Sequence, residues 1–461
     1  MPRPEVMRLS ERLAKCENLA GRFLSDAEQP ISLAQLMGGT ALRRRRSELR
    51  GRSVLLATRE QLPTALALIE LDGVARRLVI CPHDLAEEHL ASVSTKTDVD
   101  AVVCDEDVGA STLRCRVTVG SAVADSPIAP APIETEWVLL TSGTTGNPKA
   151  VVHTLPGLAG AIAANTADTG RIWGTFYDIR RYGGLQIFLR AILAGGSLIL
   201  SSHKETIHDH LVRLSRQGVT HISGTPSHWR RVLMSVGAKL IAPRYIRLSG
   251  EIADQALLDQ LRQAFPQSAI VHAYASTEAG VGFEVTDGLE GFPAKVLDTH
   301  DGGADLKVEN DLLRIRSPRT AVRYLGDDTL RFDTEGYVDT GDIVERRDDR
   351  FYFVGRRGGI INVGGFKVHP EEVEAVINRH PAVHMSRVRP KRSPIVGAII
   401  VADVVTNAPG ERVAGEEKKR LQGEILDICR GTLAHYKIPA VIQFVPNLDI
   451  NTSGKIARNN A

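Results

Sequence analysis

Short apolar segments alternate with amphipathic segments over the first 280 residues of the chain. The apolar segments are rich in Val, Ile and Leu, and they fall at residues 53–57, 78–81, 101–104, 137–141, 197–201, 219–223 and 269–274. This alternation is typical of βαβ units, in which helices join buried strands. Thr225 and Pro226 mark the start of a helix that leads into residues 228–236, because threonine suits the N-cap position and proline suits the first turn. The pattern predicts an α/β fold with sheets flanked by helices.

The pattern changes twice farther along the chain. Residues 292–354 form short β-like runs broken by Gly, Asp and Pro, which predicts a β-rich subdomain. Residues 355–365 contain five glycines in eleven positions, and this concentration favours a hinge. Beyond it, Pro370 begins a predicted helix, and a second helix at 416–433 places Cys429 among apolar neighbours.

We therefore predict three parts. Residues 1–354 form a large domain with the β-rich subdomain, residues 355–359 form the hinge, and residues 360–461 form a small α+β domain. The chain has 461 residues, of which 43% are hydrophobic and 24% charged, so both domains can bury a core.

The charge and cysteine content exclude several classes of protein. The formal charge of +2 gives no general attraction to nucleic acid or anionic membranes. The arginine run at 43–46 lacks interleaved aromatic residues, so we interpret it as a solvated surface rather than a nucleic-acid site. Five scattered cysteines and no apolar run of about 18 residues predict a cytoplasmic protein that contacts no membrane.

A segment rich in glycine and hydroxyl side chains directly follows the predicted strand at 137–141. Backbone N–H groups in such a turn bind anions, and hydroxyls and a lysine add donors, so the expected ligand is a polyphosphate. The spacing differs from the G-x-x-x-x-G-K-[ST] loop of common NTPases. The candidate ligands are Thr141, Ser142, Gly143, Thr144, Thr145, Gly146 and Lys149.

This segment, T-S-G-T-T-G-N-P-K, resembles the phosphate loop of the adenylate-forming superfamily, which contains acyl-CoA synthetases, carrier-protein adenylation domains and luciferases. Further matches follow in the family's order, and the resemblance covers residues 137–458. They are Y-A-S-T-E at 274–278, Y-V-D-T-G-D at 337–342, G-R at 355–356, G-G-F-K-V at 364–368 with its continuation to 374, and T-S-G-K at 452–455.

The resemblance implies a small acyl-CoA ligase. Such an enzyme joins a carboxylic acid to the α-phosphate of ATP, releases pyrophosphate and passes the acyl group to a thiol, here coenzyme A. A carboxylic acid with a pKa of about 4 is already ionised at neutral pH, so the first step needs no general base. Two alternatives remain: an enzyme that loads a separate carrier protein, and a nucleotide-binding protein with weakened catalysis. Gly358 in the hinge and Ala275 after the motif tyrosine motivate the second alternative.

The resemblance also assigns catalytic roles. Lys455 is the expected catalytic cation, which reaches both the acid and the α-phosphate. Thr277 is expected to bind the α-phosphate, and Glu278 to hold Mg²⁺, which prefers carboxylate oxygen. Asp342 is expected to accept the ribose hydroxyls.

Other positions are expected to bind ATP or the thiol. Tyr274 is expected to stack on adenine, with a buried structural tyrosine as the alternative, and Arg356 assists at the ribose. The remaining candidates are Ser249, Gly250 and Glu251 in an adenine-side loop, and Gly364, Gly365 and Lys367 near the incoming thiol.

The acid pocket is predicted from the same family pattern. Arg180 or Arg181 is the candidate to face a second carboxylate or the thiol cofactor, with exposure to solvent as the alternative. A metal at His203, His208 and His210 is not favoured, because helix positions two apart do not share a face. The predicted lining residues are Tyr177, Arg181, Gly183, Ser223, Ala273 and Gly280.

Overall fold

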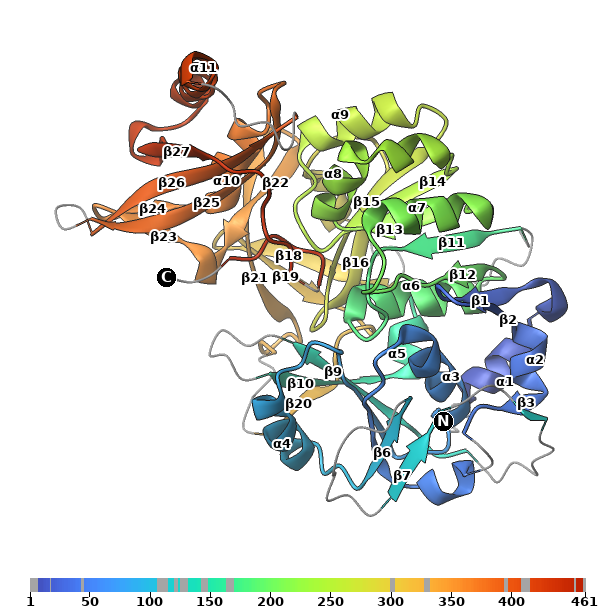
Figure 1. Ribbon diagram of the computed structural model, residues 1–461. Helices are drawn as coiled ribbons and strands as arrows, with labels where there is room; N and C mark the ends of the chain where they lie inside the picture. The colour runs from blue at the N-terminus through green and yellow to red at the C-terminus, as the bar shows by residue number, and fades with distance from the viewer. Residues whose placement is uncertain are drawn as a thin grey trace.

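Two large sheets form the body of the molecule in the computed structural model (Figure 1). The structure describes residues 7–16, 18–42, 45–105, 115–119, 123–124, 132–141, 148–162, 170–298, 303–326, 332–393, 397–407, 415–451 and 453–458.

The first sheet has eight strands, and its central strands run parallel while β2 and β16 are antiparallel edges. Its order is β16 (Gly280–Val285), β15 (Ala269–Ser276), β14 (Tyr245–Ser249), β13 (His221–Gly224), β11 (Ile172–Thr175), β12 (Ser197–Ile199), β1 (Phe23–Ser25) and β2 (Pro30–Ser32).

The second sheet has seven strands, parallel except at β10 and β20. Its order is β20 (Arg323–Leu325), β10 (Lys149–Thr154), β9 (Glu136–Thr141), β5 (Arg77–Ile80), β4 (Ser53–Leu56), β6 (Ala101–Cys104) and β7 (Cys115–Thr118). A separate short pair joins β3 (Gly39–Thr40) to β8 (Val123–Ala124).

Helices cover the sheets because each sheet has apolar side chains to bury on both faces. The largest core packs α3 and α6 with residues of both sheets, and a second core packs α7, α8 and α9 on the eight-stranded sheet. The helices are α1 (Leu9–Ala14), α2 (Leu33–Met37), α3 (Gln61–Leu71), α4 (Glu87–Lys96), α5 (Leu155–Ala159), α6 (Tyr182–Leu193), α7 (Ile207–Arg216), α8 (Pro226–Met234) and α9 (Gln255–Ala264).

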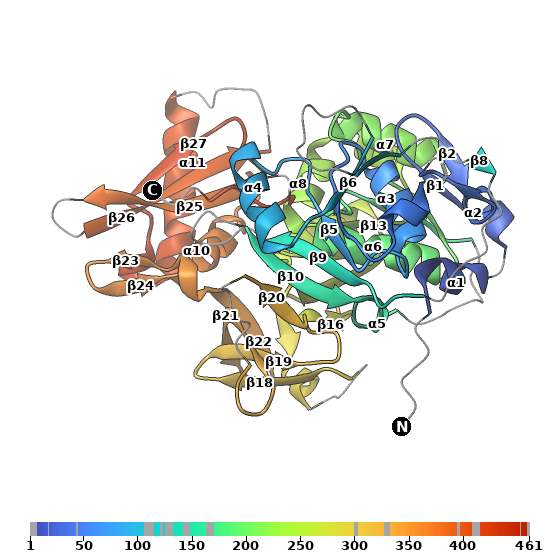
Figure 2. The ribbon, with the colours of Figure 1, turned by 90° about the horizontal axis from the view of Figure 1, so that it is seen from below.

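A five-stranded antiparallel sheet follows and has its own apolar core. Seen from below, it lies beside the larger sheets (Figure 2). Its order is β17 (Phe292–Pro293), β22 (Arg350–Arg356), β21 (Val338–Arg347), β19 (Leu312–Arg316) and β18 (Asp305–Glu309). The predicted β-rich subdomain is confirmed.

The C-terminal part forms a small α+β unit around a core that includes Cys429. In Figure 1 it lies beside α8 and α9. Its elements are β23 (Ile361–Val363), β24 (Phe366–Val368), α10 (Pro370–Ile377), β25 (Val383–Ser393), β26 (Gly397–Thr406), α11 (Gly415–Thr432) and β27 (Val441–Phe444).

The predicted fold class is confirmed. Thr225 caps α8, since its hydroxyl accepts from the backbone N–H of His228, and Pro226 occupies the first turn. The domain boundary at 354 and the hinge at 355–359 stay predictions. Within the described ranges, no helix combines the length and hydropathy that crossing a bilayer requires.

Candidate active site

Tyr274, at the end of β15, is joined to two charged residues of the five-stranded sheet. Its hydroxyl donates to Asp342, and the Arg356 Nε donates to the same carboxylate at 2.8 Å. Burial and the Asp342 charge raise the pKa of Tyr274, so its proton stays on the hydroxyl. The Tyr274 ring lies nearly parallel to Phe283 and Phe353, with centroids 5.5 and 5.3 Å away. These contacts support the structural-tyrosine alternative; stacking on adenine stays a prediction.

Lys455 lies among the charged residues of this group. A Cβ placed on Gly250 would lie 3.5 Å from the Lys455 Cε, so the side chain passes over the turn after β14. Burial and the Arg356 charge lower the pKa of Lys455, while Glu251, Asp342 and Glu278 oppose the shift. The structure thus brings the expected catalytic cation to the predicted nucleotide residues.

Glu278 has a partner that sequence reasoning missed. The Tyr324 hydroxyl donates to the Glu278 Oε1 at 3.3 Å, and the Lys149 Nζ lies 5.2 Å from the centroid of the Tyr324 ring. Tyr324 lies on β20, which pairs with β10, opposite Val151. Only this long-range pairing places the tyrosine between Lys149 and Glu278, so no local pattern indicates its position.

Thr277 is anchored through its backbone. The Nε2 of the buried His153 donates to the Thr277 carbonyl at 2.8 Å. Burial lowers the pKa of His153 to about 4, so the imidazole is neutral at pH 7.

A magnesium ion fits the carboxylate of Glu278. The described residues contain no group of three His, Cys, Asp or Glu side chains that could hold a metal by themselves. Mg²⁺ commonly uses one or two carboxylates together with substrate phosphates and water, so a single carboxylate beside a polyphosphate suits it.

The turn after β14 links the nucleotide residues to the predicted acid pocket. The buried Tyr177 donates from its hydroxyl to the Ser249 carbonyl at 2.7 Å. Gly183 lies under the Tyr177 ring, where an added Cβ would be 3.5 Å away. Ser223 donates to the Arg247 carbonyl at 3.3 Å, and Ala273 pairs with Ser249 across the sheet.

Gly280 has a backbone reason for being glycine. Its φ is +78°, and a Cβ there would lie 2.6 Å from the Arg319 carbonyl oxygen. It begins β16, opposite Ser276.

An ion cluster near this pocket, built on a buried arginine, was also missed from the sequence. Arg247 is 3% exposed and donates to the Glu284 Oε1 at 2.9 Å, and Arg190 approaches the same oxygen at 3.3 Å. Glu284 lies on β16 opposite Ala273, so the cluster adjoins a predicted pocket residue.

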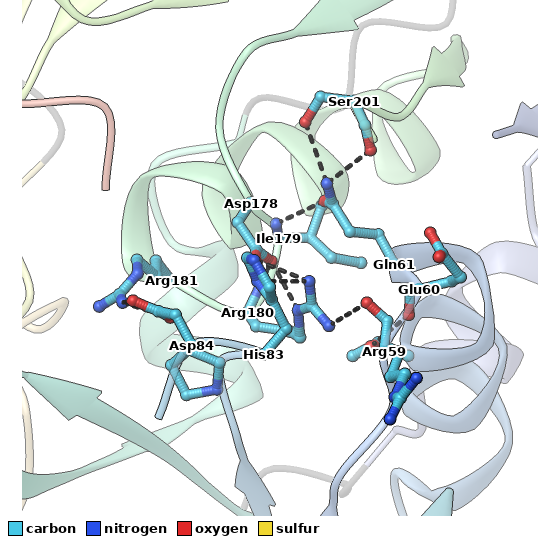
Figure 3. Close-up of polar contacts among 12 residues, drawn as sticks. Arg59, Glu60, Gln61, His83, Asp84, Asp178, Ile179, Arg180, Arg181 and Ser201 are labelled. Carbon is cyan, nitrogen blue, oxygen red and sulfur yellow. Dashed lines mark hydrogen bonds and ion pairs between the residues drawn. The ribbon is translucent and has the colours of Figure 1, made fainter. Parts of the chain in front are cut away.

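The Arg180 guanidinium bonds to other groups of the protein. Only 1% exposed, it donates to both Asp178 oxygens at 2.8 Å and to the carbonyls of Thr58 and Arg59 (Figure 3). Burial alone would raise the pKa of Asp178, but a hydrogen bond from His83 and the charge of Arg180 lower it. Little donor capacity remains on Arg180 for a second substrate carboxylate, so the structure does not favour that role.

Arg181 points away from Arg180 and pairs with Asp84 at 2.7 Å (Figure 3). Its side chain is 24% exposed, which fits the solvent-exposed alternative better than a buried pocket position. Its assignment to the acid pocket stays a prediction.

A cavity of about 350 Å³ lies beside this network and reaches the C-terminal segment. His203 and His210 both line this cavity but have different partners: His203 stacks on His83, while His210 bonds to the Thr175 carbonyl. Other lining residues are Gln61, Phe176, Asp178, Arg180, Ser201, His228, Arg231 and Asn451.

Of the other predicted residues, three lie apart from this group in the small domain, and five lie outside the described ranges. Gly364, Gly365 and Lys367 belong to the exposed β23–β24 hairpin of the small domain. Thr141 ends β9 and Lys149 begins β10. The phosphate-loop residues Ser142, Gly143, Thr144, Thr145 and Gly146 lie outside the described residues.

Comparison with known families agrees with this arrangement. A family model described as "AMP-binding enzyme" matches residues 54–316, and "AMP-binding enzyme C-terminal domain" matches residues 372–455. The chain belongs to the AMP-binding enzyme family. The resemblance to adenylate-forming enzymes is therefore confirmed.

Named relatives of this AMP-binding enzyme are ligases. A 2-succinylbenzoate–CoA ligase of Listeria monocytogenes serotype 4b is 30% identical over 353 residues, which cover 72% of each chain. The 2-succinylbenzoate–CoA ligase of Listeria innocua is 29% identical and covers 70% of this chain and 69% of its own. A mitochondrial acyl-coenzyme A synthetase of Rattus norvegicus is 26% identical over 70% of this chain and 60% of its own.

Solved structures share the fold. An anthranilate CoA ligase in complex with anthranoyl-AMP matches with a TM-score of 0.81 at 17% identity and covers 98% of this chain and 96% of its own. The o-succinylbenzoate CoA synthetase of Bacillus subtilis, bound to its acyl-adenylate, matches with a TM-score of 0.74 at 20% identity over 98% and 97%.

Proposed function

We propose that this enzyme is an ATP-dependent acid–thiol ligase. It activates a carboxylic acid as an acyl-adenylate with release of pyrophosphate and then transfers the acyl group to coenzyme A. The position of Lys455 among Glu251, Glu278, Asp342 and Arg356 is the observation that carries the proposal. The CoA ligases among the relatives support coenzyme A as the acceptor.

The first step requires charge stabilisation rather than proton removal. The substrate carboxylate attacks the α-phosphorus, and the bond from that phosphorus to the bridging oxygen of pyrophosphate breaks. Negative charge gathers on the phosphate oxygens, where the Lys455 ammonium supplies a preorganised counter-charge. The partly buried position strengthens this interaction because less water surrounds the charges.

The neighbouring residues position the nucleotide. Asp342 presents carboxylate oxygens to the ribose hydroxyls, held in place by Tyr274 and Arg356. Glu278 would hold Mg²⁺, which when bound neutralises phosphate charge. Thr277 donates its hydroxyl to the α-phosphate, on a backbone fixed by His153.

We propose that acyl transfer to coenzyme A takes place after the small domain has moved to a second position. Rotation about residues 355–359 would withdraw Lys455 and bring Gly364, Gly365 and Lys367 toward the acyl-adenylate, a hinge transition. The exposed position of that hairpin in the present arrangement supports the proposal. We place the reaction in the cytoplasm, where scattered cysteines stay reduced.

Acid-dependent exchange of labelled pyrophosphate into ATP tests the proposal. The panel contains aromatic, fatty and dicarboxylic acids, including 2-succinylbenzoate and anthranilate. Exchange with at least one acid is expected, followed by thioester formation with free coenzyme A. If no acid supports exchange, the alternative of a nucleotide-binding protein with weakened catalysis is favoured. If a thioester forms only with a purified carrier protein, the carrier protein and not coenzyme A is the acceptor.

A further inference from the structure

Glu251 joins the large domain to the segment that carries Lys455. Its Oε2 accepts from the backbone N–H of Ser227 at 2.9 Å, and its Oε1 accepts from the backbone N–H of Ile456 at 3.1 Å. Ser227 lies in the first turn of α8, where the helix dipole favours a carboxylate. One oxygen therefore fixes Glu251 on the large domain, and the other is aimed at the residue after Lys455.

Thr225 makes a second contact to the same segment. Its hydroxyl oxygen accepts from the His228 N–H at 3.0 Å and donates its proton to the Gly454 carbonyl. The N-cap of α8 thus holds the residue before Lys455, while Glu251 holds the residue after it. Thr225 is fully buried and Glu251 is partly buried, so neither hydrogen bond is readily replaced by water.

The segment is shaped and anchored independently by the small domain. The Asn451 Oδ1 accepts from the Lys455 N–H at 3.0 Å and closes the turn. Arg458 donates to the buried Glu374 at 2.6 Å, and Arg387 donates to the Ala457 carbonyl at 3.1 Å. These contacts lie within the small domain and move with it, whereas those of Glu251 and Thr225 cross between domains.

We propose that Glu251 and Thr225 are positioning residues that hold Lys455 in the site for adenylate formation and release it for thiol transfer. The inference rests on the proposed two-step function. It differs from the adenine-side role expected for Glu251, because both carboxylate oxygens are used by backbone N–H groups. We call the two contacts of Glu251 and Thr225 with the Lys455 segment the latch. Because the latch holds Lys455 only during adenylate formation, removing it should slow the two half-reactions unequally.

Half-reaction kinetics test the latch with Glu251→Gln and Thr225→Val. An amide has a single acceptor oxygen, so the Gln variant loses one of the two backbone hydrogen bonds and turns a donor toward a donor. Acyl-adenylate formation is expected to fall about 10- to 100-fold in each variant. Thioester formation from synthetic acyl-adenylate and coenzyme A is expected to fall at least tenfold less. Thr225→Ser keeps the hydroxyl and should restore the first half-reaction.

Equal losses in both half-reactions, or no loss in the first, would overturn the inference. Hydrogen exchange followed by mass spectrometry supplies a readout that needs no substrate. The Ile456 amide is expected to exchange at least fivefold faster in Glu251→Ala, which removes both acceptor oxygens, than in the wild type, and unchanged exchange would contradict the contact. If the wild type activates no acid, the proposed function fails, while the exchange measurement still decides the contact.

Discussion

Gly454 lies against His228 so closely that a Cβ on the glycine would be 1.9 Å from the His228 Cε1. The φ of Gly454 is +77°, a backbone conformation that residues other than glycine rarely adopt. Both features belong to the docked position of the residue that precedes Lys455.

Gly454→Ala is therefore expected to block docking. Acyl-adenylate formation should fall at least about 100-fold, because the added methyl group pushes the lysine segment away from α8. Gly51→Ala is the matched control: Gly51 has a φ of +72° but nothing within 4 Å. In both variants, backbone strain should lower the free energy of unfolding by about 1 kcal/mol. Similar rates of acyl-adenylate formation in the two variants would show that the contact with His228 is unimportant.

Tyr274→Phe isolates the hydrogen bond to Asp342. The ring contacts with Phe283 and Phe353 remain, but the carboxylate loses a donor that fixes its orientation. We expect an approximately tenfold rise in the KM for ATP, since a hydrogen bond to a charged group contributes about 1.5–3 kcal/mol. Tyr352→Phe, on β22, is the control, and an equal KM in both variants would show that the hydrogen bond from Tyr274 does not orient Asp342 for ATP.

His153 makes stability depend on pH. Its folded-state pKa of about 4 lies below the unfolded value of about 6.5, so its contribution is complete above pH 6.5 and is lost as the pH falls toward 4. Between pH 7.5 and 5.5, this contribution should fall by about 1 kcal/mol. Urea unfolding of the wild type and His153→Gln at both pH values isolates this contribution. The difference in the free energy of unfolding between the two proteins should shrink by about 1 kcal/mol from pH 7.5 to 5.5. A constant difference would contradict the burial of a neutral His153.

Local patterns predicted most of the fold. The strands β4, β6 and β9, the capped start of α8 and the apolar face that includes Cys429 follow from residue periodicity and capping chemistry.

The contacts that complete the site were not predictable in this way. Glu251 and Ile456 are 205 positions apart, Tyr324 and Glu278 are 46 apart, and Arg247 and Glu284 are 37 apart. Each pair depends on how sheets and domains pack, which single-sequence periodicity does not encode. Family motifs predicted roles for Asp342 and Lys455, but not the contacts of Asp342 with Tyr274 and Arg356 or the contact of Glu251 with the residue after Lys455.

Arg180 and Arg181 should differ sharply in stability. Arg180→Met leaves the buried Asp178 carboxylate without its ion-pair partner, so the free energy of unfolding should fall by about 3–5 kcal/mol. Arg181→Met removes a partly exposed pair with Asp84 and should change it by at most about 1 kcal/mol. Chemical denaturation measures both, and equal losses would contradict the assignment of Arg180 to the interior network.

The acid profile of Arg181→Met is a separate question. We expect the same preferred acids and the same dependence on coenzyme A as in the wild type, because the arginine is paired with Asp84. A selective loss of dicarboxylic acids would return Arg181 to the acid pocket.

The rate of acyl-adenylate formation by Lys455→Ala tests the central claim most directly. Single-turnover release of pyrophosphate should fall about 100- to 1,000-fold, because one preorganised charge is lost from the site where negative charge develops. Lys239→Ala, on the surface after α8, should react at the wild-type rate. If Lys455→Ala also formed the acyl-adenylate at the wild-type rate, this ammonium group would not be the catalytic cation.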